Sequence, residues 1–202
     1  MATGAIRNKP SRSGDAALRD STRWIRTILR YKSEHPSLRA VLSTIERLQE
    51  RPYRTSAVLY GEPGTGKEGL ARALHSAMGA KGEVVELSAG GRSDAAVLED
   101  LFGSRGQMAL AVVADRGTLF IDEVAGLGGA AQMLLYRLLK AGELPGTAKR
   151  VDLRVVAGSS VDLAERARDG RFRHDLYYRL ARIVLHLPPL RQRRADIART
   201  SI

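Results

Sequence analysis

From about residue 55 onward, short apolar runs alternate with stretches of helical periodicity. We interpret these runs as continuously apolar, and such a pattern is typical of strands that are buried on both faces of a sheet. Between them, apolar residues recur every three or four positions, as at Leu70 and Leu74 and again at 133–139 ahead of Gly142. Strands that alternate with helices predict an α/β fold, with a five-stranded parallel sheet between helices in a three-layer sandwich. The five expected strands cover residues 57–60, 84–87, 119–121, 153–157 and 183–187.

The pattern is different before residue 52. Residues 1–14 are polar, contain Gly, Pro and Ser and lack an apolar period, which predicts disorder. From Asp15 an amphipathic, arginine-rich helix is expected to end at Pro36, and Ser37 then caps a second helix. We therefore divide the chain into a basic N-terminal arm (1–32), a core (33–197) and a short tail (198–202).

Composition excludes several classes of protein. The 202 residues are 44% hydrophobic, enough for one domain with a substantial core. Cysteine is absent, which excludes disulfides, cysteine zinc sites and a thiol nucleophile, and four histidines give little support to a histidine metal cluster. No apolar stretch approaches the roughly 18 residues of a membrane span, and the N-terminus lacks the apolar segment of a signal peptide. We expect a cytoplasmic protein with no membrane partner.

Positive charge is concentrated at the two ends of the chain. Residues 1–32 hold eight Lys and Arg against two acids, and residues 165–202 hold ten Arg against four acids, whereas 33–164 are nearly neutral. Basic flanks favour an acidic partner, either nucleic acid or another protein. A solvated surface with an unstructured tail is the alternative.

The most specific motif follows the first expected strand and has the phosphate-loop pattern G-x-x-x-x-G-K ahead of a helix. Its glycines let the backbone wrap around phosphates, and its lysine can reach the β- and γ-phosphates. The residue after the motif's lysine is a glutamate, at the position where Ser or Thr usually ligates Mg²⁺. A glycine-rich turn with an incidental lysine is the alternative. The nucleotide-binding residues are Gly61, Glu62, Pro63, Gly64, Thr65, Gly66, Lys67 and Glu68.

Two later segments complete the expected chemistry. The run at 119–121 ends in Asp122 and Glu123, at the sheet edge where ligands bind in open α/β folds. Asp122 can hold Mg²⁺ through water, and Glu123 can polarise an attacking water. These motifs predict ATP and Mg²⁺ as cofactors. In a basic segment at 170–180, several arginines on one helix face could supply positive charge to a neighbouring subunit's γ-phosphate, unless they are ordinary surface arginines.

From Pro36 to Ile197 the chain resembles the AAA+ ATPase domain of sigma-54-dependent transcription activators, the bacterial enhancer-binding proteins. The resemblance is carried in order by GEPGTGKE, LEDLFG, GTLFIDEV and GRFRHDLYYRL with LPPLRQRRADI. It implies a ring of subunits in which Arg173 and Arg179 act as arginine fingers across an interface. In that family Glu normally follows the phosphate-loop lysine, as Glu68 does here.

The chain departs from the family pattern in several places. The Gly-Ala-Phe-Thr-Gly-Ala loop that touches the sigma factor is expected after Gly103, but 104–109 reads SRGQMA, so we interpret the loop as deleted. Ser88 replaces the Asn that restrains the catalytic glutamate, and Ser159 and Ser160 replace the Thr-Asn sensor pair. Lys32 and Ser33 replace an Ile-Gly pair at the adenine site. The sequence stops where the helical lid should begin, and neither a receiver domain nor a helix-turn-helix is present, so we expect a core without its lid.

Three hypotheses for function follow. The leading one is an ATP-binding regulator of transcription that, if it is an enzyme, hydrolyses ATP. It would assemble with itself or with a related AAA+ subunit and reach sigma-54 RNA polymerase only indirectly. The second is a degenerate AAA+ module that modulates a full-length relative. The third is a nucleic-acid-binding element that uses the basic flanks, and a small-molecule kinase is a more distant option.

Overall fold

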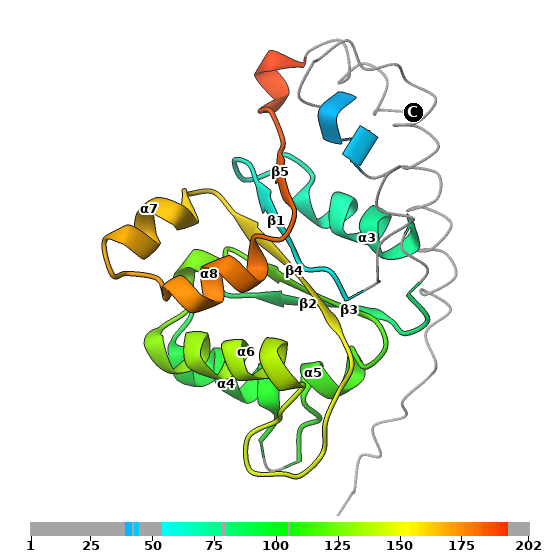
Figure 1. The fold of residues 1–202 in the computed structure, drawn as a ribbon, viewed down its shortest axis with the longest axis vertical. Helices are drawn as coiled ribbons and strands as arrows, with labels where there is room; N and C mark the ends of the chain where they lie inside the picture. Colours follow the sequence, from blue (N-terminus) through cyan, green and yellow to red (C-terminus); the bar gives the residue numbers. More distant parts are fainter. Residues whose placement is uncertain (1–38, 42, 45–53, 78–79, 105, 194–202) are drawn as a thin grey trace, which may run out of the picture.

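The computed structural model describes residues 39–41, 43–44, 54–77, 80–104 and 106–193 (Figure 1). A five-stranded parallel sheet with the order β2-β3-β4-β1-β5 forms its centre. Each expected strand is present, with limits within two residues of the prediction. The strands are β1 (Ala57–Tyr60), β2 (Val84–Ser88), β3 (Thr118–Asp122), β4 (Arg154–Ser159) and β5 (Val184–His186).

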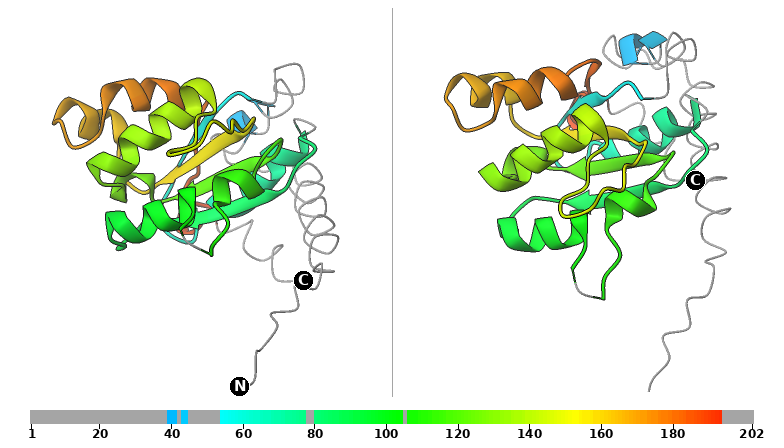
Figure 2. Two further views of the ribbon diagram at one scale, coloured as in Figure 1. Left: turned by 90° about the horizontal axis from the view of Figure 1, so that it is seen from below. Right: turned by 60° about the horizontal axis from the view of Figure 1, so that its bottom comes forward.

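Helices cover both faces of the sheet, which confirms the three-layer sandwich (Figures 1 and 2). Alternate strand residues face opposite layers, so Leu119 and Ile121 join one core while Phe120 between them joins the other. One face packs on α3 (Lys67–Ala77). The other packs on α4 (Asp94–Phe102), α5 (Leu110–Val113), α6 (Gly129–Ala141), α7 (Leu163–Arg168) and α8 (His174–Leu180). A short 3₁₀ turn, η1 (Val124–Gly126), lies between β3 and α6, and a second, η2 (Leu190–Gln192), follows β5.

The expectation that every strand is buried on both faces is wrong for the two edge strands. In β2, Glu86 and Ser88 are exposed between buried neighbours, and in β5 the flanking Val184 and His186 are exposed around Leu185. The physical reason is that each edge strand has a helical layer over only one of its faces. The three inner strands are buried almost throughout.

A buried polar cluster lies between α3 and the first residues of β3 and β4. Arg154 is 1% exposed and donates to the Thr118 hydroxyl at 3.0 Å, and the same hydroxyl lies 3.0 Å from Nδ1 of His75. The Thr118 hydroxyl accepts from Arg154 with one lone pair and shares a second hydrogen bond with Nδ1, whose direction depends on the imidazole tautomer. Burial, and then the charge of Arg154, lower the pKa of His75 to about 4.

Several expectations fall outside the described residues. These are the disorder of 1–14, the arginine-rich helix that begins at Asp15, the division at residue 32 and the tail at 198–202. Of the second helix, residues 39–41 and 43–44 are helical, and Val41 packs in the core beside α3. Within the described part of the chain, no helix is both long and apolar enough to cross a bilayer.

Candidate functional site

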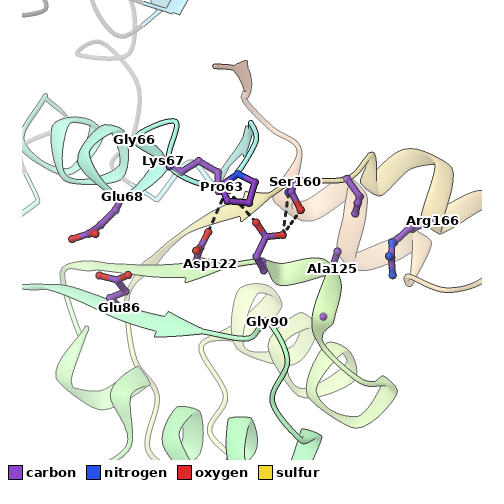
Figure 3. Close-up of a pocket in the computed structure, with 14 residues that line it drawn as sticks. Pro63, Gly66, Lys67, Glu68, Glu86, Gly90, Asp122, Ala125, Ser160 and Arg166 are labelled. Carbon is purple, nitrogen blue, oxygen red and sulfur yellow. Dashed lines mark hydrogen bonds and ion pairs between the residues drawn. The ribbon is translucent and has the colours of Figure 1, made fainter. Parts of the chain in front are cut away.

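A cavity of about 670 Å³ opens where the carboxyl ends of the inner strands meet (Figure 3). The loop after β1 forms one wall, and Glu86 of β2 lies beside it. Asp122 and Glu123 at the end of β3, Ser160 after β4 and Arg166 of α7 complete the lining. The structure thus brings the predicted phosphate loop, the paired acids and Ser160 together in one place.

The loop between β1 and α3 has the backbone conformation that its glycines allow. Gly64 and Gly66 adopt φ of 77° and 89°, in the left-handed region that other residues rarely enter. The buried Thr65 closes the turn by donating its hydroxyl to the Glu62 carbonyl at 2.7 Å. Because α3 begins at Lys67, its unpaired N–H groups and the positive end of its dipole face the cavity. This end of the cavity is suited to bind phosphate.

Lys67 forms ion pairs with the two acids across the cavity. Its side chain is 5% exposed, and Nζ lies 3.1 Å from Glu123 Oε1 and 3.8 Å from Asp122 Oδ1. It also donates to the Gly61 carbonyl at 3.0 Å. This close approach depends on Gly158 of β4, where a Cβ would lie 2.7 Å from Asp122 Oδ1. Sequence reasoning missed Gly158 because it lies inside a strand and outside any motif.

Glu123 is held in an unusual conformation. Its φ of 51° and ψ of 50° place it in the left-handed region, which costs a non-glycine residue on the order of 1–3 kcal/mol. The second carboxylate oxygen accepts from the Ser160 hydroxyl at 2.7 Å and from its backbone N–H at 3.1 Å. Partial burial raises the pKa of Glu123, but the hydrogen bonds from Ser160 and Lys67 outweigh it, and the net pKa is below its usual range. Glu123 is therefore ionised at neutral pH.

The three serines predicted to sense or switch occupy different positions. Ser160 contacts Glu123 as described, whereas the Ser159 hydroxyl donates to the Val161 carbonyl at 2.7 Å. Ser88 lies exposed on the edge strand, in register with Asp122, and its carbonyl accepts from Arg92. Within the described residues, Ser160 and Lys67 hold the Glu123 carboxylate, and Ser88 does not contact it.

The acids near the loop offer oxygen ligands for a divalent cation. Asp122 Oδ1 is buried and accepts no hydrogen bond from the described residues, so the chemistry of this atom fits a cation. No three acidic or histidine side chains of the described chain stand close enough to hold a metal by themselves. A site with one or two carboxylates completed by phosphate and water is the arrangement that Mg²⁺ prefers.

Glu68 and Glu86 are held near each other by one arginine. Glu68 accepts from Arg72 at 2.7 Å, and a Glu86 oxygen lies 3.7 Å from the same guanidinium. Burial and the neighbouring Glu68 charge raise the pKa of Glu86. Glu86, which no motif indicated, adds a further carboxylate to the cavity wall.

Arg173 and Arg179 do not line this cavity. Their guanidinium carbons each lie 5.9 Å from the centre of the Tyr136 ring on α6. Arg173 also donates to the Asp175 carboxylate from Nε at 3.0 Å and from Nη2 at 2.7 Å. Arg179 lines a second cavity of about 580 Å³, between the carboxyl end of α6 and the amino ends of β1 and β4. The structure therefore separates both arginines from the phosphate loop of their own chain.

Two further arginines pack against the phosphate loop from η2. Arg191 forms a two-pronged ion pair with Glu62 at 2.6 and 2.7 Å, and Arg193 donates to the Thr65 carbonyl at 2.7 Å. Sequence reasoning treated both as part of a basic flank. The sequence did not indicate these contacts, because they form only where the chain, after β5, comes back to the loop that follows β1.

Comparison with known proteins gives a consistent result. The family model of the sigma-54 interaction domain matches residues 31–186. The Nif-specific regulatory protein of Rhodobacter capsulatus is 34% identical over 95% of this chain and 37% of its own length. The hydrogenase transcriptional regulatory protein HoxA of Bradyrhizobium diazoefficiens is 42% identical over 72% of this chain and 33% of its own length.

A solved structure gives the same relationship. NtrX from Brucella abortus, crystallised in complex with ATP, superposes with a TM-score of 0.72 at 27% identity, over 92% of this chain and 45% of that one. The chain thus spans only 37% of the length of the first curated relative.

Proposed function

The chain belongs to the sigma-54 interaction domain family, and from this premise we propose that it binds ATP with Mg²⁺ and hydrolyses it. It has the AAA+ fold of the domain found in sigma-54-type transcription regulators. The observation that carries the proposal is the convergence of Lys67, Asp122 and Glu123 at the mouth of one cavity, with Ser160 orienting Glu123. We also infer a cytoplasmic location, where transcription takes place.

The proposed reaction begins with an exchange of partners at Lys67. Its ammonium leaves Glu123 and pairs with the β- and γ-phosphates, while the N–H groups of the loop and of α3 surround the phosphate oxygens. Asp122 would hold Mg²⁺, which neutralises charge on the phosphates. Glu123, released by Lys67 but still held by Ser160, then accepts a hydrogen bond from the attacking water and orients it toward the γ-phosphorus. The water oxygen bonds to the γ-phosphorus as the bond between that phosphorus and the oxygen bridging to ADP breaks. ADP leaves with the bridging oxygen, and the proton lost by the water passes through Glu123 to solvent.

Arg173 and Arg179 enter the proposal as residues that act on a neighbouring copy of the chain or on a related subunit. Both lie away from the cavity of their own chain, beside Tyr136. Fingers supplied in trans are worth about 10³–10⁵ in rate in related phosphoryl transfers. Specific activity should therefore rise with protein concentration, and it should fall in either Arg→Ala variant.

We propose that this chain influences sigma-54 polymerase indirectly. Where the family places its contact loop, Ser104 and Gln107 already pair in an antiparallel bridge, so the chain turns back within a few residues. A turn of this length offers little surface whose contacts differ between nucleotide states, which coupling to a partner requires. An assay of promoter opening with sigma-54 polymerase, ATP and this chain as the sole activator should give no open complex. Efficient opening would overturn the proposal of indirect action.

Turnover of Mg·ATP by the purified chain tests the central proposal. Lys67→Ala should weaken ATP binding at least tenfold, about 1.4 kcal/mol, because it removes the cation at the phosphates. Glu123→Gln should abolish turnover without weakening nucleotide binding. Binding without turnover in the wild type at every concentration would instead favour the degenerate module, and equal ATP affinity in wild type and Lys67→Ala would refute the phosphate-loop assignment.

A further inference from the structure

The charge lining the candidate nucleotide cavity is unbalanced. Its side chains include two cations, Lys67 and Arg166, against a larger number of carboxylates. Lys67 is engaged with Glu123 and Asp122, whereas the described part of the structure gives Arg166 no ion pair and no side-chain hydrogen bond. A triphosphate entering this cavity therefore meets one cation that is not already paired. The four carboxylates are Glu68, Glu86, Asp122 and Glu123.

The position of Arg166 is fixed by the packing of α7. Asp162 caps the helix by accepting from two backbone N–H groups, and Leu163 and Ala167 are buried at 0% and 1% exposure. The Arg166 carbonyl accepts from the backbone N–H of Phe172 at 3.0 Å, which ties the end of the helix to the next segment. The half-buried Arg166 side chain thus starts from a rigid backbone.

Arg166 and the phosphate loop lie at opposite ends of the cavity. Figure 3 shows Lys67 and Glu68 at one end and Arg166 at the other, with Ser160 and Ala125 between them. Phosphates held by the loop would extend past the two acids of β3, so the outermost phosphate would point toward the Arg166 end. A guanidinium offers several N–H donors in a planar fork that matches phosphate oxygens.

We propose that Arg166 contacts the terminal phosphate of a bound nucleoside triphosphate from within the same chain, and so distinguishes ATP from ADP. The inference rests on the proposed nucleotide binding and adds a residue that acts in cis, separate from Arg173 and Arg179. Because the contact involves only the γ-phosphate, loss of Arg166 weakens triphosphate binding and leaves diphosphate binding nearly unchanged. Lys67 is proposed to contact the β-phosphate as well, so its loss should weaken the binding of both nucleotides.

Calorimetric titration of the full chain with Mg·ADP and with a β,γ-imido analogue of Mg·ATP tests the proposal. Arg166→Gln should weaken analogue binding by about tenfold and change ADP binding by less than twofold. Arg166→Lys, which keeps the charge without the fork, should lie between wild type and Arg166→Gln. Arg168→Gln is the matched control, since Arg168 lies on the same helix, is exposed and does not line the cavity, so it should change neither affinity.

The outcomes separate the inference from the proposed function. If Arg166→Gln leaves the ratio of the two affinities unchanged, or lowers both equally, the proposed contact is wrong while nucleotide binding stands. If the wild type binds neither nucleotide, the proposed function itself fails. Circular dichroism of each variant reports folding, and if Arg166→Gln does not fold, an unchanged ratio in Arg166→Lys would equally overturn the proposal.

Discussion

Replacing Glu123 with Gln should tighten nucleotide binding, even though it removes the residue proposed to orient water. In the nucleotide-free protein, Lys67 is bound to the Glu123 carboxylate at 3.1 Å, and phosphates must compete for the same ammonium. Glutamine keeps the shape of the side chain but loses the charge and one acceptor. With its single oxygen on Ser160, its NH₂ group faces Lys67 and cannot accept from the ammonium. The substitution therefore weakens the competitor and leaves the rest of the cavity in place.

The size of the effect follows from the burial of the pair. Lys67 is 5% exposed and Glu123 is 25% exposed, so the ion pair is neither a surface pair nor a fully buried one. Surface pairs contribute about 0–1 kcal/mol, whereas breaking a buried pair costs about 3–5 kcal/mol. A value of about 1–2 kcal/mol is appropriate here, which corresponds to roughly 5- to 30-fold in affinity. The lost repulsion between carboxylate and phosphates acts in the same direction.

Titration calorimetry with Mg·ADP measures this effect without interference from hydrolysis. Glu99→Gln provides the control, because Glu99 is exposed on α4, lies outside the cavity and changes the net charge by the same amount. The control should bind ADP as the wild type does. Raising the salt concentration should reduce the difference between Glu123→Gln and wild type only slightly, since a largely buried pair is weakly screened.

An affinity of Glu123→Gln that equals or falls below that of the wild type would refute the reasoning. It would mean that Lys67 is not withheld from phosphates by Glu123, or that the carboxylate itself contributes to nucleotide binding. An equal gain in Glu99→Gln would point to net charge rather than to the pair.

Three further predictions concern the hydroxyl that binds the proposed water-orienting carboxylate, a buried histidine and a tight loop. Ser160→Ala should lower the rate of hydrolysis by about tenfold, as expected for the loss of one hydrogen bond to a charged acceptor. Because losing this hydrogen bond raises the pKa of Glu123, the substitution should also move the acid limb of the pH–rate profile to higher pH. Acidification from pH 6.5 to about 4 should destabilise the wild type by up to about 3 kcal/mol more than His75→Gln in urea unfolding, because the fold keeps the imidazole neutral while the unfolded chain binds a proton. Gly117→Ala should lower the free energy of unfolding by about 1–3 kcal/mol, since its Cβ would overlap backbone atoms of the facing loop, whereas Gly129→Ala at the open start of α6 should not lower the melting temperature.

The features that could be predicted from sequence are those that neighbouring residues determine. The first strand, the glycine loop and α3 follow one another without interruption, so the pattern alone specifies how the loop wraps toward Lys67. The same holds for the end of β3, where an apolar run stops at Asp122 and Glu123. In both cases the strand type and the chemistry are encoded within a few adjacent residues.

The features that could not be predicted depend on residues far apart in the chain. The position of β2 at the edge of the sheet is set by the strand order, although Glu86 and Ser88 already alternate with Val85 and Leu87 in the sequence. Gly158 is required only because Asp122 and Lys67 pass over it, and Arg191 acquires a partner only when the chain returns to Glu62. Helix α7 has six residues, too few for a clear period, so the sequence did not indicate it.

The contacts of the cavity connect nucleotide entry to the segment that carries Arg173. Phosphates that take Lys67 from Glu123 leave that carboxylate held by Ser160, which stands two residues before the cap of α7. The far end of α7 is tied through the Arg166 carbonyl to Phe172, the residue before Arg173. The resting ion pair of Lys67 and Glu123 would therefore keep the proposed base occupied until phosphate arrives. The same chain of contacts leads to α8, which Arg173 precedes and which carries Arg179, the two arginines proposed to act on a neighbouring subunit.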